Sequence, residues 1–404
     1  MQTRWGYRMA IRADDFDPTE PEDFDTAHRR YRELRQHCPV AYSSRWGGFW
    51  ALFRYEDVAR VASDYRTFTT TVQNVVPPVA FTGRRPPLHL DPPEHTAYRR
   101  VIDRALRPER VKAMEPLIRQ AVGELLSSLR EQRGGDVTGA VAQRLPGRVL
   151  GRFFQLPVDA AREVEETTRV YQRAVQAADD DQVRRSSLAL YAIARALLHQ
   201  RREFPLDPEE DVVTALLQAR DQAGDALPEN MVLGTVRQLL VTGMIAPSVF
   251  IGSLVVHLAR EPELHSWLQR CPEEIPDAVE EFLRLYTPYR GFARTPRRPV
   301  ELCGRQIREG EPVAIVFMSA NRDDAVFPEP DRFVIRRRNI HEHLAFGRGP
   351  HHCPGAGLAR AMLRIFLEEW TGTVGAFELA GPVQMTAWPE WGTTSVPVRF
   401  LGRS

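Results

Sequence analysis

A glycine-rich stretch near the C-terminus surrounds a single cysteine, Cys353, in a setting that suits a metal. From Phe346 the chain reads Phe-Gly-Arg-Gly-Pro-His-His-Cys-Pro-Gly-Ala-Gly. The glycines, Gly355 among them, permit tight turns and a close approach of the backbone to a flat ligand. The residues from about Ala356 onward predict a helix, so the cysteine lies just before a helix N-terminus, where the helix dipole favours a thiolate. The stretch therefore predicts a thiolate metal ligand.

The whole string resembles the haem-binding signature of the cytochrome P450 family, Phe-Gly-x-Gly-x-His-x-Cys-x-Gly, and meets every fixed position. A lone cysteine in a glycine-rich loop is usually structural, but the complete motif favours the haem interpretation. The resemblance implies haem b, with iron held by the thiolate of Cys353 and with Phe346, His351 and Gly355 in contact with the cofactor. A thiolate on haem iron favours O–O cleavage.

Composition limits the remaining possibilities. The chain has 404 residues and a formal net charge of +1, which gives no indication of a nucleic-acid or membrane partner. The four cysteines lack CxxC spacing, and the N-terminus lacks the apolar core of a signal peptide. We therefore expect a cytoplasmic protein, and a monomer.

One segment, 239–259, has the length and composition of a membrane span, because it contains no Asp, Glu, Lys or Arg. It lies in mid-chain, includes Pro247, Ser248, Ser253 and His257, and has no aromatic flanks. We interpret it as a core helix of a large soluble protein. The P450 resemblance implies the same, as the long helix that crosses the molecule over the haem.

The rest of the chain is mostly helical in pattern. Periodicity predicts helices at 24–37 and 56–63 and through most of 95–370, and strands at the segments 48–53, 300–302, 312–317, 377–379 and 396–401. The segment 70–93 is rich in Pro and Gly, and a loop of that length is usually functional. We expect a mainly α fold with small β-sheets. The resemblance implies a single cytochrome P450 domain over 1–404, with haem between the central helix and the cysteine loop.

Glu281 and Arg284 share one helix face at a spacing of three residues. By itself such a pair is commonly a surface ion pair that contributes little. Its position before the cysteine loop resembles the Glu-x-x-Arg motif of the family, and Arg332 matches the second arginine of that cluster. The resemblance implies a structural role beneath the haem loop.

Haem carries two propionates that need cationic or hydrogen-bonding partners when buried. His95 and Arg99 are four residues apart on a predicted helix and point the same way. They match the propionate-binding pair of the family, Arg294 matches a third contact, and His351 a fourth. As isolated residues, these would be solvated surface groups.

Basic residues continue beyond this helix, and they are Arg100, Arg104, Arg107, Arg110 and Lys112. In the family this region borders the face where an electron donor docks, and a basic surface would attract an acidic ferredoxin. A charge run is more often a solvated face. No flavin or ferredoxin domain follows the last predicted strand, so we expect external electron donors, a ferredoxin and a ferredoxin reductase.

The chain departs from the family where the central helix normally reads Ala-Gly-x-(Asp/Glu)-Thr-Thr. Here the matching string runs from Thr242 through Gly243 to Pro247. Ile245 stands in place of the acid and Ala246 in place of the alcohol of the pair that relays protons during oxygen activation. Neither replacement can carry a proton.

Pro247 has further consequences. It has no N–H, so the carbonyl of Gly243 loses its helical partner and could hold a water or a substrate donor; otherwise Pro247 only kinks the helix. Thr242 lies one turn before Ala246, and its hydroxyl could substitute in part, whereas Ser248 is near the opposite face. Our hypothesis is that protons come from water or from the substrate.

The resemblance implies a substrate pocket at positions that could equally be ordinary core or loop. These are Val79, Phe81, Leu239, Met244, Ala246, Tyr289, Arg290, Phe292 and the loop from Trp388 to Trp391. The aromatic content suggests a flat or aromatic ligand. Arg290 could meet a carboxylate or carbonyl of the substrate, or lie in solvent.

Three functions remain in competition. The first is a P450 that oxidises a small hydrophobic, aromatic natural product with O₂. The altered helix favours ring closure or C–C or C–N coupling, because activated N–H, O–H or benzylic C–H bonds of the substrate can supply hydrogen. Ordinary hydroxylation is the alternative reaction. The second is a peroxide-driven peroxygenase, against which Ile245 argues, because peroxide activation without a redox partner needs an acid or a substrate carboxylate nearby. The third is a non-enzymatic scaffold, which retention of Cys353 disfavours.

Overall fold

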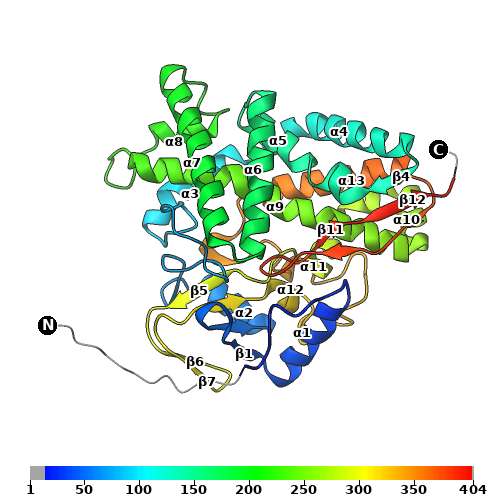
Figure 1. Cartoon of the computed structure of the whole chain (residues 1–404), viewed down its shortest axis with the longest axis horizontal. Coiled ribbons are helices and arrows are strands. Elements are labelled where there is room, and N and C mark those ends of the chain that lie inside the picture. Colours follow the sequence, from blue (N-terminus) through cyan, green and yellow to red (C-terminus); the bar gives the residue numbers. More distant parts are fainter. Residues whose placement is uncertain (1–13, 403–404) are drawn as a thin grey trace.

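The computed structural model describes residues 14–402, and helices form most of it (Figure 1). The helices are α1 (Thr26–His37), α2 (Tyr55–Ser63), α3 (Glu94–Ala105), α4 (Pro108–Glu131), α5 (Leu145–Phe153), α6 (Val158–Gln176), α7 (Asp180–Glu203), α8 (Val212–Gln218), α9 (Glu229–Arg260), α10 (Pro262–Arg270), α11 (Ile275–Leu285), α12 (Phe317–Ala320) and α13 (Ala356–Thr373). The mainly α architecture agrees with the sequence-based expectation.

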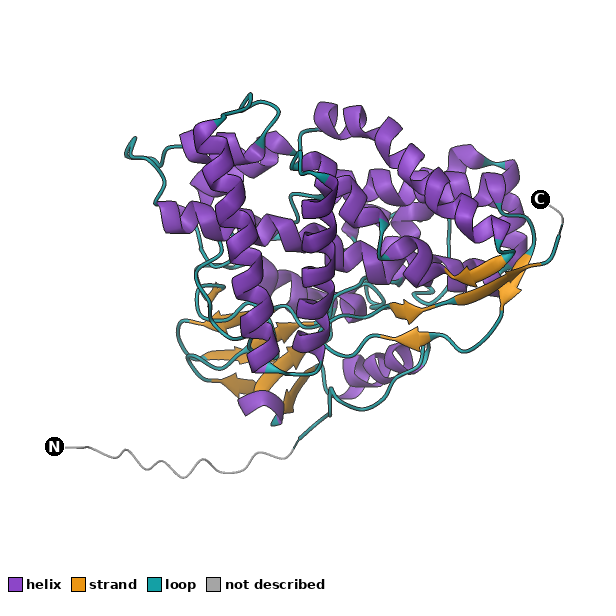
Figure 2. Ribbon diagram, turned by 45° about the horizontal axis from the view of Figure 1, so that its top comes forward, coloured by secondary structure: helices purple, strands orange, loops and turns teal. Residues whose placement is uncertain are grey.

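Strands gather in two regions, one beside α1 and α2 and one along the edge that carries the C-terminus (Figure 2). They are β1 (Val40–Ser43), β2 (Phe49–Leu52), β3 (Phe68–Thr69), β4 (Gly134–Asp136), β5 (Ala293–Pro296), β6 (Val300–Leu302), β7 (Arg305–Ile307), β8 (Val313–Ile315), β9 (Phe377–Leu379), β10 (Gln384–Met385), β11 (Thr393–Ser395) and β12 (Pro397–Phe400). The largest sheet has the order β1-β2-β8-β5-β3, and a second has the order β4-β12-β9.

The largest sheet is buried at its centre. Every residue of β2 and of β8 is buried, which explains their unbroken apolar sequences. These two strands pair in parallel, with Trp50 opposite Val313, whereas β1 and β5 flank them in antiparallel register. The sheet thereby fixes β5, which carries Arg294, close to the loop that follows α11.

Helix α9 crosses the middle of the molecule, and most of its side chains are buried (Figure 1). It is long and apolar enough to span a membrane, but packing against α5, α6, α7 and α10 encloses it. The prediction of a core helix is therefore confirmed. A Cβ at Gly243 would lie 2.8 Å from Leu150 of α5, so glycine permits the close crossing of these two helices.

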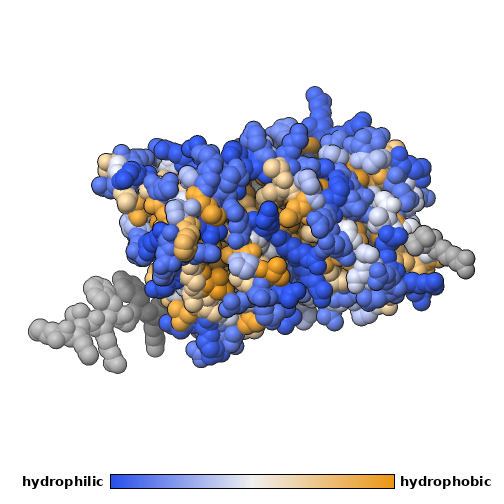
Figure 3. Space-filling view, turned by 90° about the horizontal axis from the view of Figure 1, so that it is seen from above, coloured by the Kyte–Doolittle hydropathy of each residue, from blue (hydrophilic) through white to orange (hydrophobic). Residues whose placement is uncertain are grey.

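The hydrophobic core continues on both sides of α9. Trp370 and Phe366 of α13 are completely buried, and α13 packs on α4, α10 and α11. The outer helical face is largely hydrophilic, with apolar side chains confined to separate patches (Figure 3). The segment 70–93 contains no helix or regular strand, as predicted, and only Val75 makes an isolated bridge, to Phe292.

Candidate active site

The cysteine loop is a tight turn held against α2. Gly347 and Gly349 have φ values of +71° and +74°, and a Cβ at Gly349 would lie 2.8 Å from the Cα of Ser63. The N–H of Cys353 donates to the carbonyl of Phe346 at 2.8 Å. Helix α13 starts directly after Gly355, so the cysteine precedes a helix N-terminus as the sequence predicted.

The sulfur of Cys353 lies in a buried environment. Burial raises the pKa of the thiol, while the Gly355 N–H, which hydrogen-bonds the sulfur, acts in the opposite direction together with the charges of Arg99 and Arg360. A bound metal cation favours the thiolate, because a coordinating thiol is deprotonated by the charge of its metal.

Two arginines fix the shape of the loop. Nη1 of Arg99 donates to the carbonyls of Pro350 at 3.1 Å and His352 at 2.5 Å. Arg360 stacks over the ring of Phe346, with 4.6 Å between Cζ and the ring centroid. Arg99 thus directs Nη1 to the loop backbone and Nε to Asp103, at 2.7 Å, and its propionate contact stays a prediction.

His95, His351 and Arg294 come together beside the loop from three separate segments. The rings of His95 and His351 are 4.8 Å apart, and Nε2 of His351 lies 3.8 Å from Oδ1 of Asp91. Burial lowers the pKa of His95 to about 4 and that of Arg294 to about 10. Asp91 is also bound by Arg297, at 2.6 Å.

This cluster holds more donors than acceptors. Nε2 of His95 is buried without a hydrogen-bond partner among residues 14–402. Arg294 is 6% exposed, and its Nη1 donates only to the carbonyl of Ala293. Buried donors of this kind favour an anion. The residues present therefore fit the propionates of a haem whose iron faces Cys353.

A second arginine cluster lies at Glu281, and here one prediction was wrong. Arg284 grips Glu281 through Nε at 2.8 Å and Nη2 at 2.7 Å, with both side chains fully buried. The second guanidinium is that of Arg337, at 3.0 Å, and not that of Arg332. The Arg332 side chain is exposed and pairs with Glu329, while its carbonyl accepts from Arg284. The chain turns between the two positions, which sequence spacing does not reveal.

The altered string on α9 presents no free proton donor. Thr242 Oγ1 donates to the carbonyl of Gln238 at 3.1 Å, and Ser248 Oγ donates to that of Ile245 at 2.7 Å. Thr242 and Ala246 share one face, and Thr242 is exposed although most of the helix is buried. The helix continues through Pro247 without a break in its assigned span.

Comparison with known proteins identifies the family. The family model for cytochrome P450 matches residues 188–371. Mycinamicin IV hydroxylase/epoxidase of Micromonospora griseorubida is 34% identical over 374 residues, which are 89% of this chain and 91% of that protein. The chain belongs to the cytochrome P450 family.

Other P450s resemble the chain over nearly its whole length. Nocardicin C N-oxygenase of Nocardia uniformis is 33% identical over 87% of this chain and 88% of that protein. The structure of CYP109Q5 from Chondromyces apiculatus matches with a TM-score of 0.86 at 29% identity, covering 96% of this chain and 99% of that chain. P450s are haem b oxidoreductases with a cysteine thiolate as axial ligand, and their bacterial members use small-molecule substrates and redox partners.

In this P450, an apolar cluster lies between α9 and the segments expected to form the pocket. Val241 and Ile245 of α9 pack with Tyr171 of α6, and Val79 and Tyr289 pack against them. The position of the missing acid, Ile245, is therefore part of this apolar surface. Tyr171 and Val241 were not anticipated, because family positions alone did not indicate which face of each helix turns inward.

Other predicted pocket residues have different surroundings. Phe81 is 68% exposed, and Met244 is buried in the cluster with Leu150 of α5, two residues and about 200° around the helix from Ala246. We therefore no longer place Phe81 and Met244 in the lining of the substrate pocket. Leu239 is half-buried against the same cluster as Met244.

Phe292 is half-buried, with its ring 4.4 Å from that of Tyr289. Trp388 is buried and donates from Nε1 to the carbonyl of Val76 at 2.6 Å. The Trp388 side chain therefore helps to hold the segment 70–93 in place, whereas the Phe292 ring packs on Tyr289 within the loop after α11.

Arg290 is a structural residue rather than a substrate contact. It is buried, pairs with Glu22, and donates to Tyr31 Oη at 3.1 Å and to the carbonyl of Glu390 at 3.0 Å. The side chain of Glu390 accepts from Gln176 at 2.9 Å, and burial raises its pKa to about 7. Glu390 is a buried carboxyl in the loop from Trp388 to Trp391, which the sequence assigned to the pocket without singling out this side chain.

The basic residues of α3 and α4 are less available than the sequence indicated. Arg104 and Arg107 pair with Glu209, and Arg107 and Arg110 with Glu210. Both glutamates lie just before α8, far away in sequence. Three arginines of the expected positive row therefore share two carboxylates, and the row is only partly neutralised.

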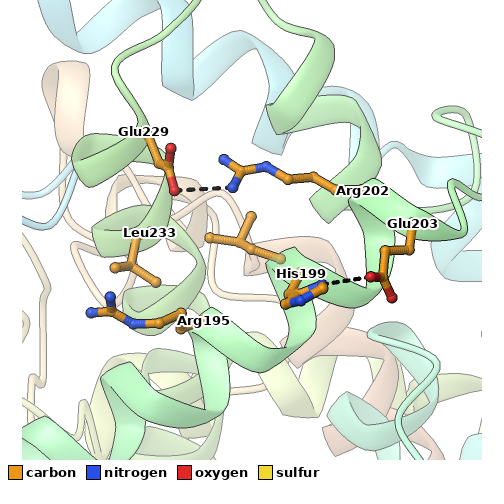
Figure 4. Close-up of a pocket in the computed structure, with 7 residues that line it drawn as sticks. Arg195, His199, Arg202, Glu203, Glu229 and Leu233 are labelled. Carbon is orange, nitrogen blue, oxygen red and sulfur yellow. Dashed lines mark hydrogen bonds and ion pairs between the residues drawn. The ribbon is translucent and has the colours of Figure 1, made fainter.

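A surface hollow of about 330 Å³ lies between α7 and the start of α9 (Figure 4). Glu229 pairs there with Arg202, and Glu203 with His199. Arg195 also lines the hollow, and because all of these charged groups are exposed, the hollow offers little to a ligand.

Proposed function

We propose that this P450 oxidises a small hydrophobic, aromatic secondary metabolite with O₂ and external electron donors, and that the reaction ends in cyclisation or coupling. The observation that carries the proposal is the replacement of the acid–alcohol pair by Ile245 and Ala246. The apolar cluster around Ile245 supports it, because Val241, Tyr171 and Val79 surround that position with side chains that carry no carboxylate, and the buried carboxyl of Glu390 is held by Gln176.

The local hydroxyls support the same interpretation. The protons of Thr242 and Ser248 are held by carbonyls of their own helix, and burial raises the pKa of Tyr289 well above its usual value. None of the three delivers a proton readily. A substrate with an activated N–H or O–H, or an ordered water, supplies it instead.

The roles of the site residues follow from their positions. Cys353 ligates the iron, and His95, Arg294 and His351 bind the propionates, while Arg99 fixes the loop. Bound haem supplies the activation of O₂. Val79, Val241 and Ile245 exclude bulk water, and Tyr289 and Phe292 offer aromatic surface to a flat substrate.

The relatives favour a natural-product substrate. Their names describe oxidation of mycinamicin IV and nocardicin C, and another relative, from Salinispora arenicola, is cyclomarin C epoxidase. We extend the substrate class to this chain, and not those compounds. We also propose ferredoxin and its reductase as donors to a cytoplasmic monomer.

The test begins with optical titration of the ferric protein against aromatic, cyclic-dipeptide and terpenoid compounds. The best ligand is then turned over by wild type and by the double variant Ile245→Asp with Ala246→Thr. We expect the double variant to shift products toward hydroxylation. The matched control is Ile245→Leu with Ala246→Val, which keeps both positions apolar. An unchanged rate and product ratio in the double variant would refute the proposal.

A further inference from the structure

Two arginines are buried above the apolar cluster, where four segments meet. Arg237 of α9 is 0% exposed and Arg85, from the segment 70–93, is 5% exposed. The guanidinium of Arg237 lies over the ring of Tyr171 of α6 at 4.8 Å and that of Tyr191 of α7 at 5.9 Å. Nη1 of Arg85 is 3.4 Å from Tyr171 Oη.

All their hydrogen-bond partners are neutral side chains. Arg237 donates to Ser187 Oγ at 3.0 Å and to Gln238 Oε1 at 3.4 Å. Within residues 14–402, neither arginine forms an ion pair, and Nε of both, like Tyr191 Oη, is buried without a partner. Two buried charges without a counter-ion are costly to the folded protein.

The neighbouring titratable groups respond to this positive charge. Burial lowers the pKa of His89 to about 3, and the charge of Arg85 adds to the effect, so His89 is neutral. Burial raises the pKa of Tyr171, but the charges of Arg85 and Arg237 outweigh it and lower the pKa overall. The surroundings therefore favour a negative group close to both guanidiniums.

Arg237 lies on the side of α9 that faces the candidate pocket, and Arg85 contacts the same tyrosine, Tyr171. Arg237, Val241 and Ile245 follow one another at intervals of four residues, so they share one side of α9. Val241 and Ile245 belong to the apolar cluster with Tyr171, Val79 and Tyr289. With a rise of 1.5 Å per residue, Arg237 lies about 13 Å along the helix from Ala246.

We propose that Arg85 and Arg237 bind a carboxylate of the substrate at the end of the pocket remote from Cys353. This inference rests on the proposed function and narrows it, since the substrate is then an acid. Two guanidiniums suit a carboxylate because each offers paired N–H donors. The apolar body of the substrate lies along Val241 and Ile245, with its reacting end near Ala246.

The experiment uses tethered haem ligands on the holoenzyme. Imidazol-1-yl butanoic, octanoic and dodecanoic acids and their methyl esters are titrated by the Soret shift that iron-bound imidazole produces. We expect one of the longer acids to bind at least tenfold more tightly than its ester, and the shortest acid to show no preference. Sodium acetate, added at the same concentration as the imidazolyl acid, should not weaken the binding of that acid.

Variants test whether Arg85 and Arg237 cause the preference for the acid over its ester. Arg237→Gln and Arg85→Gln should each reduce the acid-to-ester ratio about tenfold, whereas Arg202→Gln, at the exposed surface hollow, should leave it unchanged. Equal affinity of acids and esters at every length, or a preference that survives both substitutions, overturns the proposal. Competition by acetate at that concentration also overturns it, since the site then takes any small anion.

A second readout separates this inference from the haem assignment. Decanoate should raise the thermal midpoint of wild type more than methyl decanoate does, and Arg237→Gln should abolish the difference. If no imidazole produces a Soret shift, the haem proposal fails, and the thermal difference still decides the arginine site. Equal midpoints with the acid and the ester count against it.

Discussion

Two pairs of buried arginines in this P450 differ in what neutralises them. Arg284 and Arg337 share the carboxylate of Glu281, and their other donors reach backbone carbonyls. Among residues 14–402, Arg85 and Arg237 meet only hydroxyls, an amide and aromatic rings. The first pair has its counter-ion, Glu281, within the fold, whereas we propose that a bound carboxylate supplies the counter-ion of the second pair. We therefore assign a structural role to the arginines that are paired with a carboxylate, and ligand binding to those that are not.

The largest effect is expected from breaking the complete pair. Arg284→Ala should lower the free energy of unfolding by about 3–5 kcal/mol, because it leaves Glu281 buried with one partner fewer. Chemical denaturation measures the loss, and haem content per chain should fall with it. Arg332→Ala is the control, and its effect should stay within about 0.5 kcal/mol, because the side chain is exposed. Equal losses in the two variants would restore Arg332 to the cluster.

The buried carboxyl of Glu390, which lies beside the pocket, should make the stability of the protein depend on pH. Its pKa is near 7 in the folded protein, above the usual 4.5, so the folded state retains a proton that the unfolded state releases. The free energy of unfolding should therefore fall by about 3 kcal/mol as pH rises between these values and be level above them.

Denaturation at a series of pH values measures that slope. Glu390→Gln should remove the contribution, because the amide does not titrate, and Glu378→Gln, at an exposed pair with Arg399, should keep it. A wild-type slope that persists in Glu390→Gln would assign the titration to another group.

Removing an unpaired charge should have the opposite sign. Arg237→Met should raise the stability of the ligand-free protein by about 2 kcal/mol, because an apolar side chain replaces a buried charge without a counter-ion. The measurement is the denaturation midpoint without ligand. A loss of stability would mean that the ring contacts with Tyr171 and Tyr191 and the hydrogen bond to Ser187 outweigh the cost of the unpaired charge, and would contradict the comparison of the two arginine pairs.

The smallest effect is expected at the surface hollow of Figure 4. Arg202→Gln removes an ion pair with Glu229 in which the side chains are 47% and 69% exposed. The free energy of unfolding should change by no more than about 0.5 kcal/mol and should depend on salt. A larger, salt-independent effect would show that exposure is a poor guide to the cost of an unpaired charge here.

Local sequence signals predicted much of the fold. Segments 300–302 and 377–379 are strands β6 and β9 as expected, and segment 312–317 contains β8. The last residue of that segment, Phe317, instead begins α12. The short strand β3 was missed, because two residues carry no alternation to recognise.

The residues of the candidate site also fall into those that the local sequence predicted and those that it missed. The turn at Cys353 and the altered string at Ile245 depend on neighbours in sequence, so motif and periodicity were enough to find them. Arg237 was missed although it stands just before the charge-free segment 239–259, because a single arginine is usually a solvated one. Its burial depends on α6, α7 and the segment 70–93.

The sequence by itself determined the family, the central helix, the thiolate loop and the loss of the proton relay, because each is written in contiguous residues. Only the tertiary structure decided which charges are neutralised. Arg337 replaced Arg332 at Glu281, Glu209 and Glu210 paired with three arginines of the basic row, and Arg237 has no acid partner among residues 14–402. Counter-charge and burial are properties of segments that meet in space, and spacing along the chain does not record which segments meet.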